Sequence, residues 1–407
     1  MRFFTFLRFM RQILRKKPAN LEWIQKQSLL AVKLAQIFAL RPDIIGDEKC
    51  QQLQKLYQHA ISIPSENLYK TIEEKGPDNF LENFSSIEDK PLAAASIGQV
   101  HRAKLKTGEE VVIKFIKSAN ASTFEKEVTK MKRWLKILLI FSPKLRKVGN
   151  PMALLNHVSD YTLRELDLTN EIKGARELNK IKNDVSENFP MKLLRFPKYY
   201  EDISNEHILV SEFISGESLE EGIKNKSLSW NQLLELFRIH GAFMFGIGTF
   251  HGDLHPGNCF IDNDGKFVFI DNGAICYAPK HVNQTLFNFF EHLSKQEMDE
   301  AYDALLDMSE HKIKGKRLEK YRKEMAKIYS GFEAKPVGEQ SLTTIMMKTV
   351  KTAVKIAKAE FGEEAFPIIR ALMYLDGLVI RTHPEVVLIK SMGPYLKEFR
   401  TNLKFEN

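Results

Sequence analysis

Cysteine is scarce in this chain of 407 residues, which contains only Cys50, Cys259 and Cys276. Three widely separated thiols cannot form a disulfide framework or a Cys-x-x-Cys metal site, so they favour a reducing compartment. The sequence also lacks any run of 18 uncharged apolar residues, about the length that a membrane-spanning helix needs. Any membrane contact should therefore be peripheral. With 43% hydrophobic residues, the chain can still bury a core large enough for two lobes.

Acidic residues are absent from residues 1–20, where basic side chains alternate with large apolar ones. This composition is typical of a basic amphipathic helix, and an anionic membrane surface is the partner that we expect for it. An organelle-targeting segment and a plain helix docked on the body are the alternatives. We expect a cytoplasmic protein that is peripheral to the membrane, or a mitochondrial or plastid protein if the source is a eukaryote.

The rest of the chain separates into helical and strand-like stretches. Residues 21–60 have helical periodicity and predict a helical hairpin around Arg41-Pro42-Asp43. Another helix should begin at Pro64-Ser65 and end at Gly76-Pro77. Residues 93–116 predict two strands joined by a turn at Thr107-Gly108-Glu109.

Further along, residues 122–182 predict helices and residues 207–214 a short buried strand. A small hairpin should turn at Asn263-Asp264-Gly265 within helix-rich sequence. The predicted segments are an amphipathic stretch (1–20), an N-terminal helical extension (21–90), a lobe with strands and a helical insertion (91–214) and a helix-rich lobe (215–407).

The strongest chemical signal is His251-Gly252-Asp253-Leu254-His255-Pro256-Gly257-Asn258, followed after the hairpin by Asp271-Asn272-Gly273. Phosphoryl transfer needs a carboxylate beside the nucleophile, and an amide oxygen and a second carboxylate that hold Mg²⁺ against nucleotide phosphates. Asp253, Asn258 and Asp271 supply these groups in that order, and the hairpin should bring the two metal ligands to neighbouring strand ends. A histidine metal site and simple turn caps are the alternatives.

Lys114 ends the apolar run Val111-Val112-Ile113. In the kinase pattern, a strand lysine of this kind is a point charge on the nucleotide phosphates. A downstream helix carries Glu165, Asp167 and Glu171, any of which could be its ionic partner; Asp167 and Glu171 should share one helix face. On its own, such a lysine or such a helix is more often simply solvated.

Glu212 and Ile214, just before Ser215-Gly216, fit the hinge whose backbone groups pair with adenine. Recognition through the backbone leaves little side-chain signature, so this assignment depends on the other motifs.

Together these motifs resemble the UbiB family of atypical kinases and ATPases, whose members are linked to coenzyme Q biosynthesis and lipid handling. The family's Lys-x-Gly-Gln motif looks like Lys33-Leu34-Ala35-Gln36, followed by Arg41-Pro42-Asp43, and its Glu-x-Asp motif looks like Glu165-Leu166-Asp167. Glu171 matches the usual partner of the strand lysine. The likeness covers roughly residues 21–279. The family's alanine-rich loop, a candidate nucleotide contact, looks like Ala93, Ala94, Ala95, Ser96, Ile97, Gly98, Gln99 and Val100.

The resemblance implies an α+β, two-lobed protein-kinase-like fold with an N-terminal helical extension. In such a fold, Lys33 would point into the cleft near Glu165 and Asp167, and Asp253, Lys114, Glu171 and Lys33 would be catalytic residues. The implied cofactors are ATP and Mg²⁺. The implied acceptor is a lipid or quinone precursor, and no nucleic acid is expected as a partner. Nothing in the sequence indicates an oligomeric state.

Two residues depart from the family pattern. Ala35 stands where the family has glycine, and Asn272 replaces the phenylalanine of Asp-Phe-Gly. They leave room for a nucleotide-binding lipid accessory protein with weak turnover. An aminoglycoside- or choline-type phosphotransferase is the other alternative, because its loop is similar to residues 251–258, but the Lys33 motif and the alanine-rich loop disfavour it.

Overall fold

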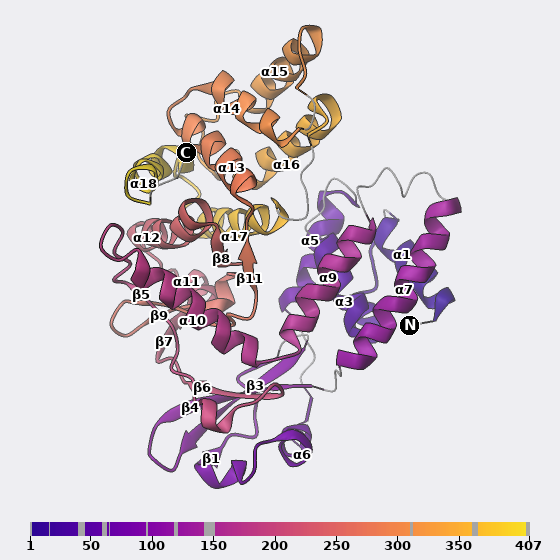
Figure 1. Cartoon of the computed structure of the whole chain (residues 1–407), viewed down its shortest axis with the longest axis vertical. Coiled ribbons are helices and arrows are strands. Elements are labelled where there is room, and N and C mark those ends of the chain that lie inside the picture. Colours follow the sequence, from indigo (N-terminus) through magenta and orange to yellow (C-terminus); the bar gives the residue numbers. More distant parts are fainter. Residues whose placement is uncertain are drawn as a thin grey trace. The chain divides into compact units, whose positions relative to one another are not determined.

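The computed structural model describes residues 2–15, 17–39, 45–58, 63–64, 66–94, 97–117, 121–141, 151–309, 312–359 and 365–403. The chain forms two compact units, drawn in Figure 1. Unit 1 comprises Met1–Lys173 and Pro197–Phe213, and unit 2 comprises Gly174–Phe196 and Ile214–Asn407. Several residues named above lie outside the described part: Arg41, Pro42, Asp43, Ser65, Ala95 and Ser96.

Unit 1 combines a small sheet with a group of helices. Its helices are α1 (Phe3–Leu14), α2 (Leu21–Gln25), α3 (Leu29–Phe38), α5 (Asp47–Gln58), α6 (Glu66–Lys75), α7 (Ala121–Phe141), α9 (Pro151–Glu165) and the first turn of α10 (Thr169–Asp184), with short 3₁₀ turns at Phe80–Asn83 and Glu201–Ile203. Its strands are β1 (Phe84–Ile87), β2 (Ala93–Ala94), β3 (Gly98–Leu105), β4 (Glu110–Ile116) and β6 (Ile208–Glu212).

The sheet of unit 1 is antiparallel, with strand order β1-β3-β4-β6 and β2 paired to β3. Strand β4 alternates in burial although its sequence reads as an apolar run: Val111, Ile113 and Phe115 are fully buried in one cluster. Lys114 lies between Ile113 and Phe115, so its side chain leaves from the opposite face of the sheet. The two strands and the intervening turn expected from the sequence are confirmed, with Gly108 in a left-handed conformation, φ +101°.

The helices of unit 1 share a second core, to which α1, α3, α7 and α9 all contribute. Helix α1 buries Phe6, Phe9 and Ile13 there. The predicted helical hairpin is present as α3 and α5, with an additional break before α3, where the Ser28 hydroxyl caps the helix by accepting from the Ala31 N–H at 3.3 Å.

Unit 2 is mainly helical. Its helices are the remainder of α10, α11 (Leu219–Asn225), α12 (Trp230–Gly241), α13 (Lys280–Ser294), α14 (Met298–Ala304), α15 (Lys316–Ile328), α16 (Leu342–Thr352), α17 (Ala365–Thr382) and α18 (Leu388–Asn402), with π-helical turns at Ala242–Ile247 and Ala353–Ala357 and 3₁₀ turns at Pro256–Asn258 and Leu305–Met308. Its strands are β5 (Leu194–Arg195), β7 (Gly216–Ser218), β8 (Thr249–His251), β9 (Cys259–Asp262), β10 (Phe267–Phe269) and β11 (Ile275–Tyr277).

Two small sheets, β5-β10-β9-β7 and β11-β8, lie against the helical core of unit 2. The predicted hairpin is confirmed as β9 and β10, which pair antiparallel. Its turn is closed by Asp262, whose carboxylate accepts from the N–H groups of Asp264 at 3.0 Å and Lys266 at 2.8 Å. Gly265 has φ +77°, a conformation that glycine adopts without strain.

Across the described segments of both units, no helix is long and apolar enough to cross a membrane.

The burial of α1 yields a stability prediction. Phe9→Ala should lower the free energy of unfolding of unit 1 by about 3–5 kcal/mol, because it leaves a cavity in the helical core. Phe4→Ala is the matched control on the exposed side of the same helix and should change the free energy of unfolding by less than about 0.5 kcal/mol. Denaturant unfolding in a Trp230→Phe background, where the remaining tryptophans Trp23 and Trp134 both report on unit 1, measures the difference. Equal midpoints for the two variants would contradict the docking of α1.

Candidate functional site

In unit 1, Lys114 forms an ion pair with Glu171. The pair is sheltered, with 20% of the lysine side chain and 9% of the glutamate side chain exposed. Of the three carboxylates that the sequence offered as partners, the structure therefore selects Glu171. A charged group as buried as Glu171 needs such a partner, because an unpaired buried charge is strongly destabilising.

The expectation that one helix carries Glu165, Asp167 and Glu171 is wrong. Helix α9 ends at Glu165 and α10 begins at Thr169, since the Asp167 carboxylate accepts from the Thr169 N–H at 3.0 Å and ends the helical run. Asp167 also pairs with Lys173 at 3.9 Å. The three carboxylates thus serve three different purposes.

Lys33 lies on α3, and its Nζ is 2.5 Å from the Glu165 carboxylate, with 12% and 19% of the two side chains exposed. It also lies 5.6 Å from the centre of the Tyr161 ring. Lys33 is thus a sheltered, paired lysine, and its expected closeness to Asp167 stays a prediction. Next to it, Ala35 is fully buried among apolar side chains, so the extra Cβ is accommodated.

Within the described part of the alanine-rich loop, Gly98 lies beside Lys114, whereas β2 lies along the opposite edge of β3 from β4. Ala93 and Ala94 form β2, which pairs with Val100 and Gln99. A Cβ on Gly98 would come within 3.0 Å of the Phe115 carbonyl oxygen, a tight contact that favours glycine, and within 3.8 Å of the Lys114 Cε, an ordinary van der Waals distance.

The Gln99 side chain is occupied within the protein. Its amide exchanges hydrogen bonds with the backbone of Ile63, at 2.9 and 3.0 Å, and contacts His101 at 3.0 Å. Its neighbours Ile97 and Gly98 are buried. Nucleotide contacts from this loop stay a prediction, and the backbone rather than the Gln99 amide is the group that could make them.

The two predicted hinge residues fall in different units. Glu212 ends β6 in unit 1, where its N–H donates to the Lys198 carbonyl at 2.8 Å. Ile214 is buried in unit 2. The Glu212 N–H is therefore already used, and adenine pairing at this point stays a prediction.

In unit 2, four hydrogen bonds form a closed ring that joins the predicted catalytic and metal-binding residues. His251 Nε2 donates to the Ile270 carbonyl at 3.0 Å, and the Ile270 N–H donates to the Asn258 carbonyl at 3.0 Å. Asn258 Nδ2 donates to the Asp253 carbonyl at 3.0 Å, and the Asp253 N–H donates to His251 Nδ1 at 3.1 Å. The ring needs a neutral imidazole, and burial lowers the pKa of His251.

Asp271, next to Ile270, has φ +55°. Such a conformation is uncommon for a residue with a side chain and often marks a functional site. The following Asn272 is fully buried and donates through Nδ2 to the Phe269 carbonyl at 2.8 Å. A Cβ on Gly174 would lie 2.0 Å from the Asn272 carbonyl oxygen. A polar anchor thus holds the loop where the family pattern has phenylalanine.

Helix α17 supplies two residues that the sequence analysis missed. Arg370 donates to the Gly252 carbonyl, and the Tyr374 hydroxyl donates to the Asp253 carboxylate at 2.9 Å. The only sequence signal is that Arg370 and Tyr374 lie four residues apart, on one face of a largely apolar helix. They lie 118 and 121 residues after their partners Gly252 and Asp253, so the sequence gives no sign of these contacts.

The residues present in unit 2 fit Mg²⁺. The Asn258 amide nitrogen is fixed on Asp253, which orients its oxygen, and Asp271 adds a carboxylate; both are hard oxygen ligands of the kind that Mg²⁺ prefers. The histidine alternative gains no support, because no three His, Cys, Asp or Glu side chains gather as a metal site in the described residues. Burial also lowers the pKa of His240, which packs against Phe250, to about 3.

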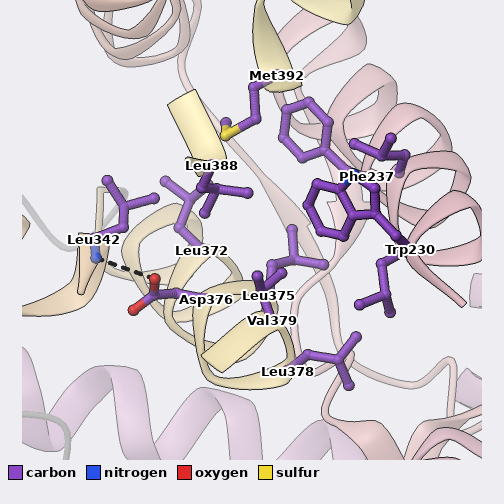
Figure 2. Close-up of a pocket in the computed structure, with 12 residues that line it drawn as sticks. Trp230, Phe237, Leu342, Leu372, Leu375, Asp376, Leu378, Val379, Leu388 and Met392 are labelled. Carbon is purple, nitrogen blue, oxygen red and sulfur yellow. Dashed lines mark hydrogen bonds between the residues drawn. The ribbon is translucent and has the colours of Figure 1, made fainter. Parts of the chain in front are cut away.

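A pocket in unit 2 has none of these motif residues in its lining (Figure 2). It is lined by side chains of α12, α17 and α18 and by Leu342. Its one acidic residue, Asp376, caps α16 by accepting from the N–H groups of Leu342 at 3.0 Å and Thr343 at 2.9 Å. The pocket therefore offers apolar surface but no group suited to phosphoryl chemistry.

Comparison with known proteins agrees with this geometry. Residues 55–305 match the model of the ABC1 atypical kinase-like domain. The chain belongs to this family. It is 26% identical over 391 residues to the "Probable protein kinase UbiB" of Pseudomonas fluorescens, covering 92% of this chain and 70% of the relative, and 26% identical over 393 residues to the protein of that name from Aliivibrio fischeri, covering 92% and 69%.

A solved structure shows the same fold. The complex of Rv3197 with erythromycin from Mycobacterium tuberculosis has a TM-score of 0.52 to this structure at 20% identity and covers 94% of this chain and 95% of that one. With the family match, this confirms the α+β kinase-like fold expected from the sequence.

The Lys33–Glu165 pair should be energetically coupled. Lys33→Ala should destabilise unit 1 by about 2–4 kcal/mol, near the loss seen when one partner of a buried pair is removed. Part of this loss should be recovered when Glu165→Gln is added, giving a coupling of about 1 kcal/mol or more in a double-mutant cycle.

The exposed Lys26–Glu22 pair, at 2.6 Å, is the matched control. Its cycle should give a coupling of less than about 0.5 kcal/mol, as for solvated helix pairs. If the two cycles give equally small values, Lys33 is an ordinary surface lysine.

Proposed function

We propose that this chain binds ATP with Mg²⁺ and either hydrolyses the nucleotide or transfers its γ-phosphate to a small, lipid-like acceptor. The observation that carries the proposal is the ring of hydrogen bonds that fixes Asp253 and Asn258 next to Asp271 in unit 2. Unit 1 adds the Lys114–Glu171 pair. Together they supply every charged and polar group that kinase-like phosphoryl transfer uses.

Each residue has a distinct role in this proposal. Lys114, oriented by Glu171, binds nucleotide phosphates, while Asn258 and Asp271 hold the cation. When bound, Mg²⁺ neutralises phosphate charge. Asp253 accepts the proton of the attacking water or acceptor hydroxyl. The Lys33 ammonium group, held in position by Glu165, adds a further positive charge.

For the acceptor, we favour a lipid or quinone precursor and a role in ubiquinone or isoprenoid lipid metabolism. The support is family membership and the motif resemblance, since the relatives carry the UbiB name. Those relatives are named as protein kinases, so a protein acceptor is the competing possibility, and labelling with radioactive ATP in the presence of lipid extract or of protein substrate separates the two.

The rival from another class is a nucleotide-binding accessory protein with negligible turnover. Asn272 is the feature that favours it, because an amide side chain that hydrogen-bonds the Phe269 carbonyl stands in the proposed metal loop where the family pattern has an aromatic ring. Phosphate release measured with Mg²⁺ and ATP, with and without anionic vesicles, distinguishes an ATPase from this rival.

Asp271→Asn tests the metal assignment. It should abolish Mg²⁺-dependent ATP binding and turnover, because it removes the negative charge that lets a hard cation bridge protein and phosphates. Asp264→Asn, in the exposed turn of the same hairpin, is the control and should bind normally. Calorimetric titration of both folded variants gives the answer; unchanged Mg·ATP affinity and turnover in Asp271→Asn would refute the assignment.

Tyr374→Phe tests the contact with Asp253. We expect kcat to fall about tenfold, equivalent to about 1.4 kcal/mol, while KM for ATP stays unchanged, because the hydroxyl orients a carboxylate and touches no nucleotide in this proposal. Tyr395→Phe, which removes a hydroxyl from α18, should leave both constants unchanged. A rise in KM with constant kcat would show that Tyr374 acts in binding.

A further inference from the structure

Helices α1 and α7 carry an unusual share of exposed apolar side chains. Ten large hydrophobic residues are exposed in the described part of the chain, and four of them lie on these two helices: Phe4, Leu14, Ile137 and Ile140. Phe4 is 82% exposed and Ile140 66% exposed. Isolated exposed hydrophobic residues are normal, but a group of them on neighbouring elements marks an interaction site.

The two helices lie in direct contact (Figure 1). The rings of Phe3 and Phe6 on α1 lie 5.8 and 5.9 Å from the ring of Trp134 on α7. All of these residues belong to unit 1. The exposed side chains of α1 and α7 therefore belong to neighbouring parts of one folded unit.

The outward side of each helix combines apolar and basic residues. On α1, the residues at positions 4, 8 and 11 are Phe, Arg and Arg, a spacing that places them on one side, opposite buried Phe6, Phe9 and Ile13, and the exposed Arg15 follows the helix as its C-cap residue. On α7, the exposed residues at positions 126, 130, 133, 137 and 140 are Lys, Lys, Arg, Ile and Ile, opposite buried Val128, Met131 and Leu135. Neither row contains an acid.

One arginine of this set is already held in place. The Arg8 guanidinium lies 4.7 Å from the centre of the Trp23 ring, so it stays at the surface in a fixed orientation. We call the outward rows of both helices, together with Leu14, the α1–α7 surface.

We propose that the α1–α7 surface docks on an anionic lipid bilayer, with Phe4, Leu14, Ile137 and Ile140 inserted among the headgroups and the basic side chains beside the phosphates. Basic residues near an anionic leaflet are attracted to it, and exposed apolar side chains gain by entering the acyl boundary. A nucleic acid would satisfy the charges, but it would leave the three aliphatic side chains without an apolar environment. The combination favours a bilayer.

The proposal differs from a detachable N-terminal anchor. Phe6, Phe9 and Ile13 stay in the core of unit 1, so the folded unit docks as a whole. Deleting residues 1–17 would therefore remove core side chains together with surface ones and could not test docking. Substitutions of exposed residues test it cleanly, and the test does not depend on ATP turnover.

The experiment measures co-sedimentation of the full chain with vesicles of phosphatidylglycerol and phosphatidylcholine and with vesicles of phosphatidylcholine alone. We expect binding to the anionic vesicles only. The double variant Phe4→Glu, Ile140→Glu should weaken this binding by about tenfold or more, because it removes two inserted groups and places charges of the same sign as the lipid at the surface.

Two controls separate this surface from general effects. Leu81→Glu changes an exposed apolar residue elsewhere in unit 1. Lys320→Glu with Lys323→Glu alters a lysine-rich helix, α15, that has no exposed large apolar side chain in its described length. Both should bind as the parent does, and circular dichroism should show that all variants are folded.

The alternatives have distinct results. Equal losses in the Phe4/Ile140 variant and the α15 variant would mean that overall charge alone drives binding, and the proposal would fail. Undiminished binding of the Phe4/Ile140 variant would overturn it directly. A third result would assign the surface to nucleic acid instead. In that case the parent would bind single-stranded RNA but no vesicles, and the Phe4/Ile140 substitutions would weaken the RNA binding.

Discussion

The ring of hydrogen bonds through His251, Asp253, Asn258 and Ile270 is the constraint that holds the candidate catalytic and metal-binding residues of unit 2. It fixes the backbone on both sides of Asp253 and attaches the end of β10 to the residue before β9. Within the ring, each residue donates one hydrogen bond and accepts one. A neutral imidazole is the only state of His251 that can donate at one nitrogen and accept at the other, and burial favours that state.

The ring is in turn supported by parts of the chain that are distant in sequence. The His251 ring lies edge-on to Phe269, 6.2 Å between ring centres, within the large core of unit 2. From the C-terminal side, Arg370 and Tyr374 hold the backbone and the carboxylate of the catalytic loop. From the N-terminal side, the missing Cβ of Gly174 lets α10 approach the Asn272 carbonyl. Preorganisation of this kind lets a few polar groups act without further rearrangement.

What could be predicted from the sequence was mostly local. The β9–β10 hairpin follows from a turn flanked by apolar strands, and the proximity of Asn258 and Ile270 follows from the hairpin. The two-residue period of any strand likewise places Lys114 on the face opposite Ile113 and Phe115. The kinase-like fold was predictable because these local motifs occur in a fixed order.

The parts that could not be predicted depend on side chains that compete for backbone hydrogen bonds, or on contacts between residues far apart in the sequence. The Asp167 side chain bonds the backbone and ends a helical run that periodicity alone would continue. Gln99 looks like a loop residue near the nucleotide, but Ile63, which is 36 residues away, takes its amide. Tyr374 reaches Asp253 across 121 residues, a distance over which one sequence carries no pairing information.

Helix α1 shows most clearly why amphipathicity alone does not define a partner. Its apolar residues do not form one face: Phe6, Phe9 and Ile13 recur at helical spacing and fill the core, whereas Phe4 and Leu14 lie outside that row. A helix with apolar residues on two sides has two apolar environments to satisfy. The protein core satisfies the first, at a contact that buries complete aromatic rings. The arginines lie around Phe4 and Leu14, so a partner of this second side must accept both positive charges and apolar side chains. An anionic bilayer interface does so, because it offers negative headgroups beside hydrocarbon.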